Sequence, residues 1–207
     1  MTPSTSQVIF VARDRDHDGT PDDYDNDDDL DMYLITTRLA QRDAIRFNNN
    51  QGDTSRMDAD KLFRNDPDTA LQHPVFTNVS KQAGIVHPGF GLGVNICDIN
   101  RDGWKDIYVT NDFFGSDLLY INDRKGPFIN KLNECIKHSS QNAMGNDIGD
   151  INNDGLQDII AVDMNPEDNY RKKKNMNGNN YFIAQNMQYE GLSLQYVRNT
   201  LQLNLGA

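Results

Sequence analysis

Two short segments of the chain place oxygen-bearing side chains at alternate positions. They read DINRDGWKD (Asp98–Asp106) and DINNDGLQD (Asp150–Asp158). Oxygen donors at positions 1, 3, 5 and 9 can surround one centre, and position 7 adds a main-chain carbonyl. Glycine at position 6 permits a sharp turn, because a positive φ costs little without a Cβ. This set of hard donors is typical of a Ca²⁺ loop and excludes soft metals.

The predicted ligands follow directly from this spacing. In the first segment they are Asp98, Asn100, Asp102 and Asp106, with the carbonyl of Trp104; in the second they are Asp150, Asn152, Asp154 and Asp158, with the carbonyl of Leu156. The alternative is a metal-free turn between strands. That alternative leaves three mutually repelling carboxylates together without a cation.

Other calcium loops begin in the same way but continue differently. An EF-hand requires a bidentate glutamate at position 12, where this chain has Val109 and Ala161. Dockerin-type loops also require an acidic group there and a helix after it. The β-branched runs DIYVT and DIIAV that follow favour strands instead.

The aspartate-rich run Asp14–Asp31 divides into two further frames, DRDHDGTPD and DYDNDDDLD. The first frame keeps a turn glycine, Gly19, whereas the second has Asp28 at that position and leads directly into a strand-like run. Taken alone, the run resembles thrombospondin type-3 repeats. We predict one or two Ca²⁺ ions here, with the second frame favoured. The predicted ligands are Asp14, Asp16, Asp18 and Asp22 in the first frame, and Asp23, Asp25, Asp27 and Asp31 in the second.

The elements that must position these loops form an internal repeat. Each loop runs into a β-like stretch (MYLITT, IYVTND, IIAVDM), and a second strand ending in asparagine follows (KLFRND, LLYIND, NTLQLN). Such spacing is typical of propeller-like arrays. The sequence therefore predicts an all-β fold with about three copies of one mostly β unit, over residues 1–75, 76–130 and 131–207. An apolar stripe predicts a short inserted helix over Tyr181–Tyr196.

Composition excludes several classes of function. The chain has 31 acidic and 20 basic residues and a formal charge of −11, which argues against nucleic acid or an anionic membrane surface as a partner. No apolar run is long enough to span a bilayer, so direct membrane insertion is not expected. Two cysteines are too few for a disulfide framework. The four histidines show no catalytic pairing, and no nucleophile or phosphate-binding motif occurs, so we expect no enzyme.

The segments GFGLGVNICDINRDGWKDIYVTNDFFGSDLLYIND and AMGNDIGDINNDGLQDIIAVDMNPEDNYR resemble FG-GAP/VCBS repeat proteins with an integrin-α-type propeller. In particular they are similar to the ASPIC/UnbV-associated proteins, which are related to cartilage acidic protein and abundant in Bacteroidetes. The resemblance implies a β-propeller of four-stranded blades, with Ca²⁺ loops joining the first two strands of each blade. Three copies are fewer than the four to eight that close a propeller, so we expect part of a larger, about seven-bladed one.

The resemblance further implies a secreted, outer-membrane or cell-surface setting, although Met1–Ala12 does not read as a signal peptide. The expected function is recognition of a protein or glycan ligand, with Ca²⁺ as a structural clamp. The alternatives are an accessory propeller of a polysaccharide-processing enzyme system and a purely structural spacer. We also expect contact with remaining blades of a parent protein, or self-association. The loop with Asp163, Glu167 and Asp168 is interpreted as a blade-to-blade turn, with ligand contact as the alternative.

Overall fold

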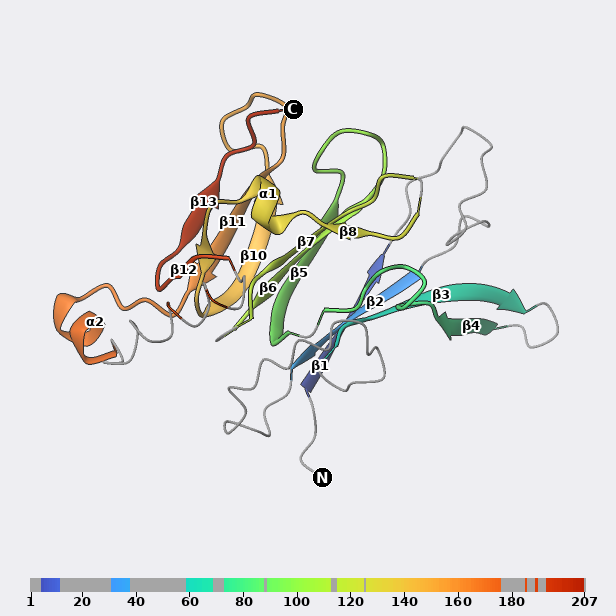
Figure 1. The fold of residues 1–207 in the computed structure, drawn as a ribbon, viewed down its shortest axis with the longest axis horizontal. Coiled ribbons are helices and arrows are strands. Elements are labelled where there is room, and N and C mark those ends of the chain that lie inside the picture. The colour runs from blue at the N-terminus through green and yellow to red at the C-terminus, as the bar shows by residue number, and fades with distance from the viewer. Residues whose placement is uncertain are drawn as a thin grey trace.

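The computed structural model describes residues 5–11, 31–37, 59–68, 73–87, 89–112, 115–124, 126–175, 185, 189 and 193–206. Most strands in these ranges pair antiparallel, which confirms the predicted all-β fold. Three sheets follow one another across the molecule, with the second between the other two (Figure 1). The division into units at residues 75 and 130, and the propeller itself, stay predictions.

The strands of each sheet are hydrogen-bonded in chain order. The first sheet contains β1 (Thr5–Val11), β2 (Asp31–Thr37), β3 (Lys61–Asp68) and β4 (His73–Asn78). The second contains β5 (Gly91–Cys97), β6 (Asp106–Asn111), β7 (Leu118–Ile121) and β8 (Ile129–Asn130). The third contains β10 (Ala143–Gly149), β11 (Asp158–Asp163) and β13 (Thr200–Gln202). A short parallel pair joins β9 (Ser139–Ser140) to β12 (Gln195–Tyr196).

The strand registers repeat from sheet to sheet. Asp31 pairs with Val11, Asp106 with Cys97 and Asp158 with Gly149, so the three aspartates begin the second strand of their sheets. The registers of β5 and β10 also shift at matching places near their starts. The internal repeat read from the sequence is therefore a repeat of backbone geometry.

Two hydrophobic clusters hold the sheets together. Alternate residues of a strand point to opposite faces of a sheet, so β6 serves both clusters. Ile107 and Val109 pack with Tyr33 and Ile35 of the first sheet, while Tyr108 packs with Ile159 of the third. Each fully buried side chain of this size contributes about 1.5–3 kcal/mol relative to an exposed one.

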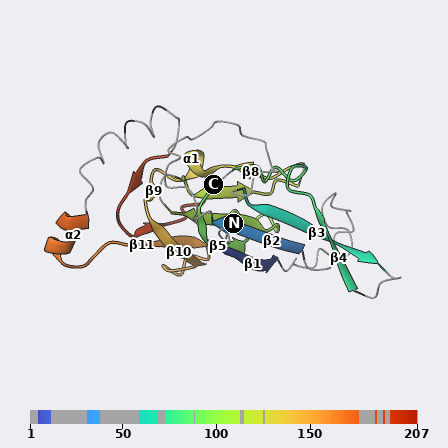
Figure 2. The same cartoon turned by 90° about the horizontal axis from the view of Figure 1, so that it is seen from below.

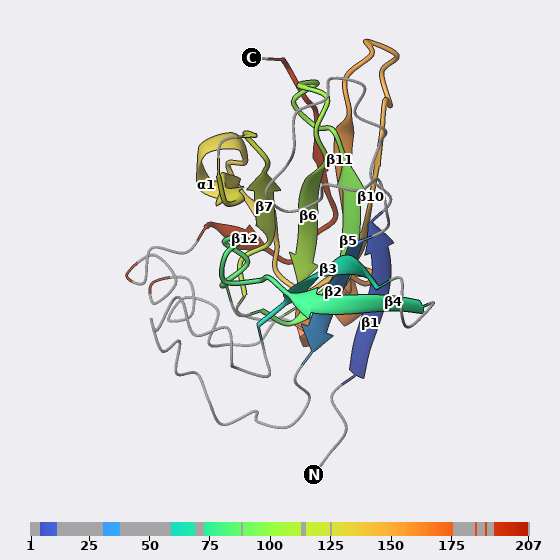
Figure 3. The same ribbon diagram turned by 90° about the vertical axis from the view of Figure 1, so that its right-hand side faces the viewer.

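The first strands of the second and third sheets, β5 and β10, run side by side (Figure 3) and approach each other closely. A Cβ added at Gly93 would lie 2.9 Å from the Cα of Gly145. Asn95 Nδ2 also donates to Asn146 Oδ1 at 2.7 Å. The glycine at position 93 is thus required by a close approach between sheets.

Two helices have both of their ends within the described ranges. α1 (Leu132–Cys135) covers part of the second cluster, and α2 (Asn169–Asn175) extends away from the sheets (Figure 2). No helix in the described part of the chain is both long and apolar enough to cross a membrane.

The helix predicted over Tyr181–Tyr196 is wrong at its C-terminal end. Gln195 and Tyr196 form β12, because their main chains pair with Ser139 and Ser140 of β9. Gln185 and Tyr189 are helical, and the remaining residues before Ser193 lie outside the described ranges.

Candidate metal-binding loops

Both regular aspartate loops connect the first two strands of a sheet, and they lie at the same end of the molecule (Figures 1 and 3). Their backbones take the same path. Arg101 and Asn153 have φ of 61° in both cases, and Gly103 and Gly155 have φ of 90° and 85°. The glycine that the pattern requires at position 6 therefore does occupy the left-handed region.

Side chains in the first loop fold back onto its own amides. Asp98 accepts hydrogen bonds from the amides of Asp102 (3.0 Å) and Gly103 (2.8 Å). Asn100 Oδ1 also accepts from the Asp102 amide, and its Nδ2 donates to Asp102 Oδ2, both at 3.0 Å. Asp102 Oδ1 accepts from the amide of Trp104 at 2.9 Å. The predicted ligands at positions 1, 3 and 5 are thus gathered around one turn.

The second loop repeats every one of these contacts. Asp150 accepts from the amides of Asp154 (3.0 Å) and Gly155 (2.8 Å). Asn152 bonds the Asp154 amide (3.1 Å) and the Asp154 carboxylate (2.8 Å). Asp154 Oδ1 accepts from Leu156 at 2.8 Å. Two different amino-acid sequences around the shared donors therefore give one geometry.

The aspartate at position 9 lies buried at the base of each loop. Asp106 is fully buried and accepts from the amides of Ile99 (3.0 Å) and Asn122 (2.9 Å). Asp158 is likewise buried and accepts from Ile151 (3.0 Å) and Asn204 (2.8 Å). Each closing aspartate therefore ties its loop to the third strand of the sheet.

In the first loop, burial and the neighbouring carboxylates disfavour the ionised form of the closing aspartate, Asp106. Burial raises the pKa of Asp106 to about 6. Its two amide hydrogen bonds lower the pKa, while the charges of Asp102 and Asp98 raise it. A cation beside these groups would favour the ionised form.

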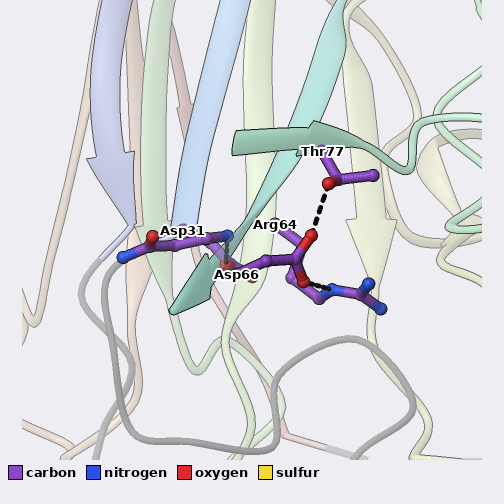
Figure 4. Close-up of polar contacts among 5 residues, drawn as sticks. Asp31, Arg64, Asp66 and Thr77 are labelled. Atoms are coloured by element: carbon purple, nitrogen blue, oxygen red, sulfur yellow. Dashed lines mark hydrogen bonds and ion pairs between the residues drawn. The ribbon is translucent and has the colours of Figure 1, made fainter. Parts of the chain in front are cut away.

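The aspartate-rich run is described only at its last residue. Asp31 Oδ1 accepts from the Asn65 amide at 2.9 Å, which is the contact that Asp106 makes with Asn122. Close by, Asp66 lies between Arg64 and Thr77 (Figure 4). The hydrogen bond from Arg64 lowers the pKa of Asp66. The other predicted ligands of this run, Asp14, Asp16, Asp18, Asp22, Asp23, Asp25 and Asp27, lie outside the described residues.

Within the described ranges, no three His, Cys, Asp or Glu side chains form a ready-made metal cluster. The aspartate oxygens of the two loops instead accept hydrogen bonds from loop amides. The set of donors at each turn is nevertheless two aspartates and an asparagine above a buried aspartate. This combination of hard oxygens fits Ca²⁺ by type.

Surroundings of the two loops differ. The guanidinium of Arg124 lies 4.8 Å from the ring centre of Trp104, which is buried, and it donates to the main-chain oxygen of Asp102. At the second loop, Asn204 Nδ2 donates to the carbonyl of Ile99 at 2.9 Å. This last bond joins the second loop to the first.

The asparagines that anchor the closing aspartates were not predicted from the sequence. Asn65, Asn122 and Asn204 each donate their amide to an aspartate at position 9. The signal was present, because the second strand-like run after each loop closes with an asparagine (KLFRND, LLYIND and NTLQLN). Asn122 and Asn204 also accept from the amide two residues later, which begins the turn that follows.

A second buried motif was also missed. Asp117 accepts from the amide of Asn111 (3.0 Å) and from the hydroxyl of Tyr108 (2.8 Å). Asp60 makes the same pair of bonds with Thr36 (2.9 Å) and Tyr33 (3.1 Å). Burial raises the pKa of Asp117 to about 7 and that of Asp60 to about 6. These carboxyls brace the second and third strands of their sheets.

The loop after β11 makes contacts within the chain. Asp163 Oδ2 accepts from Ser140 Oγ (2.6 Å) and from the Gln141 amide (3.1 Å). Asp168 Oδ1 accepts from the Arg171 amide at 2.9 Å at the start of α2. Glu167 is exposed. The first two contacts give Asp163 a structural role within its own unit, and the blade-to-blade turn stays a prediction.

Comparison with known proteins finds a family model that covers both loops, and two relatives that match part of the chain. Residues 98–161 match the family model of the FG-GAP-like repeat. Integrin alpha-3 of Mus musculus is 31% identical over 83 residues, which cover 35% of this chain and 8% of the integrin. Integrin alpha-3 of Cricetulus griseus gives the same figures. The chain spans far less than two thirds of the length of these relatives. Residues 98–161 carry sequence of the FG-GAP-like repeat type, and part of the chain is similar to an integrin α chain.

Proposed function

We propose that this chain is a calcium-binding β-propeller repeat region that serves recognition or adhesion outside the cell. The observation that carries the proposal is that the two loops have the same geometry and the same hydrogen bonds. Sequences that differ at several positions keep the same donors, a positive φ at the same two positions and the same hydrogen bonds. Without an ion, the ionised carboxylates gathered at each turn would repel one another.

In this proposal the loop residues hold the ion and the sheet holds the loop. Asp98, Asn100 and Asp102 would bind from the turn, with Asp106 approaching from the buried side. Asp150, Asn152, Asp154 and Asp158 would do the same in the third sheet, and the carbonyls of Trp104 and Leu156 complete the predicted sets. When bound, Ca²⁺ supplies positive charge that offsets the repulsion among carboxylates. The ion then acts as a clamp between the first two strands of a sheet.

Similarity to integrin α chains supports the extracellular or cell-surface setting and the role in recognition. We infer a protein or glycan ligand, no nucleic-acid partner and no catalytic activity of this chain. The finer assignment to ASPIC/UnbV-associated proteins with a larger, about seven-bladed propeller belongs to the same proposal. It rests on the motifs quoted above and on the FG-GAP-like match.

Titration calorimetry of the 207-residue chain with CaCl₂ tests the proposal. We expect binding with a Kd of about 10⁻⁴–10⁻³ M, as in other extracellular calcium modules. Thermal unfolding with and without chelator should show a lower Tm without calcium, because an ion that binds only the folded state stabilises it. Asp102→Asn and Asp154→Asn should each remove one site.

A matched control removes a carboxylate elsewhere. Glu134 is exposed on α1 and forms an ion pair with Lys131 at 2.7 Å, so Glu134→Gln should leave the calcium isotherm unchanged. An absence of calcium binding, together with a Tm that chelator does not move, would overturn the clamp. The loops would then be hydrogen-bonded turns only.

A further inference from the structure

The two predicted calcium loops are joined by one residue, Asn204. It follows β13 of the third sheet and donates its amide to Asp158 Oδ1 at 2.8 Å. Its Nδ2 donates to the carbonyl of Ile99 in the first loop at 2.9 Å and to the carbonyl of Gln157 in the second at 3.3 Å. Asn204 therefore contacts both loops at once.

Ile99 lies between predicted ligands of the first loop. Its amide donates to Asp106 Oδ2 at 3.0 Å. Its carbonyl belongs to the peptide group that leads into Asn100. The hydrogen bond from Asn204 thus fixes main-chain atoms directly beside a ligand. A continuous series of hydrogen bonds links the closing aspartate of one loop to that of the other.

The two loops also approach each other at their turns. A Cβ added at Gly155, in the turn of the second loop, would lie 3.7 Å from Nη1 of Arg101, in the turn of the first. This is an ordinary van der Waals distance. The loops are therefore neighbours at the turn as well as at Asn204.

We propose that the two calcium sites are coupled, so that an ion at one loop strengthens binding at the other, and that Asn204 carries this coupling. The coupling rests on the calcium sites proposed above and makes them interdependent.

The coupling arises from the ordering of Asn204. When the second loop holds an ion, Asp158 is fixed in place, and its hydrogen bond fixes the main chain of Asn204. The side chain of Asn204 is then held toward Ile99, so the first loop loses less conformational freedom when its own ligands close. By thermodynamic linkage the effect has the same size in the opposite direction.

Repulsion between the two ions opposes this effect. Asn100 and Asp154 are exposed, so solvent reaches both loops. At physiological ionic strength the Debye length is about 8 Å, and charges at exposed loops are screened accordingly. The ordering of Asn204 therefore decides the sign, and the coupling is positive.

Two-dimensional NMR of the isotope-labelled 207-residue chain during titration with CaCl₂ tests the coupling. The amide of Gly103 donates to Asp98 at 2.8 Å, and that of Gly155 donates to Asp150 at 2.8 Å. An ion held by these carboxylates changes the chemical shift of the bonded amide. The two glycine amides therefore report the Kd of the first and second loops separately.

Two variants that each disable one loop give the size of the coupling. Asp154→Asn disables the second loop and should raise the Kd of the first about fivefold. Asp102→Asn disables the first loop and should raise the Kd of the second by the same factor, because coupling is reciprocal. Measured again in the Asn204→Ala background, both factors should fall close to one. Asn204→Ala removes the bond to Ile99 but keeps the main-chain bond to Asp158.

Asp147→Asn is the matched control. It removes one carboxylate from an exposed position of β10 that belongs to neither loop, so it should leave both Kd values unchanged. Chemical shifts outside the loops confirm that each variant folds.

The outcomes separate this coupling from the calcium sites themselves. Calcium binding at each loop with a Kd that does not depend on the other loop would overturn the coupling and leave the sites standing. Factors that survive Asn204→Ala would overturn the role of Asn204. Glycine amides that do not respond to calcium at all would overturn the sites, and the coupling with them.

Discussion

The loops Asp98–Asp106 and Asp150–Asp158 have the same internal geometry in different surroundings. Every hydrogen bond among positions 1, 3, 5, 6 and 7 of one loop recurs in the other. Yet the aspartate at position 5 is partly buried in the first loop, as Asp102, and exposed in the second, as Asp154. The turn is thus encoded locally, whereas its burial depends on what stands beside it.

The second and third sheets also differ in the residues at two matching positions within the sheets. The second sheet has the buried pair Asp117 and Tyr108. At the same places the third sheet has Asn199, which accepts from the amide of Asp163 at 2.8 Å, and Ile160. Both members of the pair are therefore replaced in the third sheet: Asp117 by Asn199, and Tyr108 by Ile160. A buried phenol needs a partner for its hydroxyl, and an isoleucine needs none.

Asp106→Ala should have the largest effect on stability. The substitution leaves the amides of Ile99 and Asn122 without an acceptor in a buried setting, which costs about 3 kcal/mol. Asp158→Ala removes the same two bonds beside a more exposed loop, where water can replace them, so we expect about 1–2 kcal/mol. Urea denaturation in chelator measures both. Equal losses would show that the surroundings of the loop do not change the free-energy contribution of these hydrogen bonds.

The second largest effect should be a pH dependence of stability that comes from the second sheet and not from the third. Burial raises the pKa of Asp117 from 3.8 to about 7. A raised folded-state pKa gives stability that is fully present below the unfolded pKa and is lost as pH rises through the folded one. Asp117 alone should therefore lower the free energy of unfolding by about 2 kcal/mol between about pH 5 and pH 7. Asp60 and Asp106, whose pKa values burial raises to about 6, should add smaller losses in the same range.

Asp117→Asn copies Asn199 of the third sheet and should make the loss smaller by about 2 kcal/mol, leaving the part that Asp60 and Asp106 contribute. Urea denaturation at a series of pH values provides the measurement. Asp147→Asn, at an exposed position of β10, is the control and should keep the wild-type slope. A slope that is the same in Asp117→Asn and the wild type would assign the pH dependence to other carboxyls.

Alanine at the turn glycines should have the smallest effect and should be similar in both loops. Gly103 and Gly155 have positive φ, where a Cβ costs about 1–2 kcal/mol. The added Cβ would lie 3.2 Å from Arg124 at Gly103 and 3.7 Å from Arg101 at Gly155, and both contacts are with the mobile ends of side chains. Gly149→Ala, where nothing lies within 4 Å of the new Cβ, is the control. A comparable loss there would contradict the role of φ.

Much of the fold could be predicted from local patterns. The strands after each loop, the equivalence of Asp31 with Asp106 and Asp158, and the turn glycines all follow from alternation and from residue types with special φ. These features depend on interactions within a few residues, which a sequence displays directly. The helix over Tyr181–Tyr196 was misjudged at its end because β12 forms only by pairing with β9, more than 50 residues away.

The sequence by itself determined the repeated unit and its oxygen-rich turns, since both arise from short-range geometry. Tertiary structure alone decided which face of each sheet is covered. Tyr108 and Ile160 hold the same position in their strands, yet one is buried and the other exposed, because a further sheet packs on only one of them. Burial is a property of neighbours brought together by folding, and no local pattern records which neighbours are present.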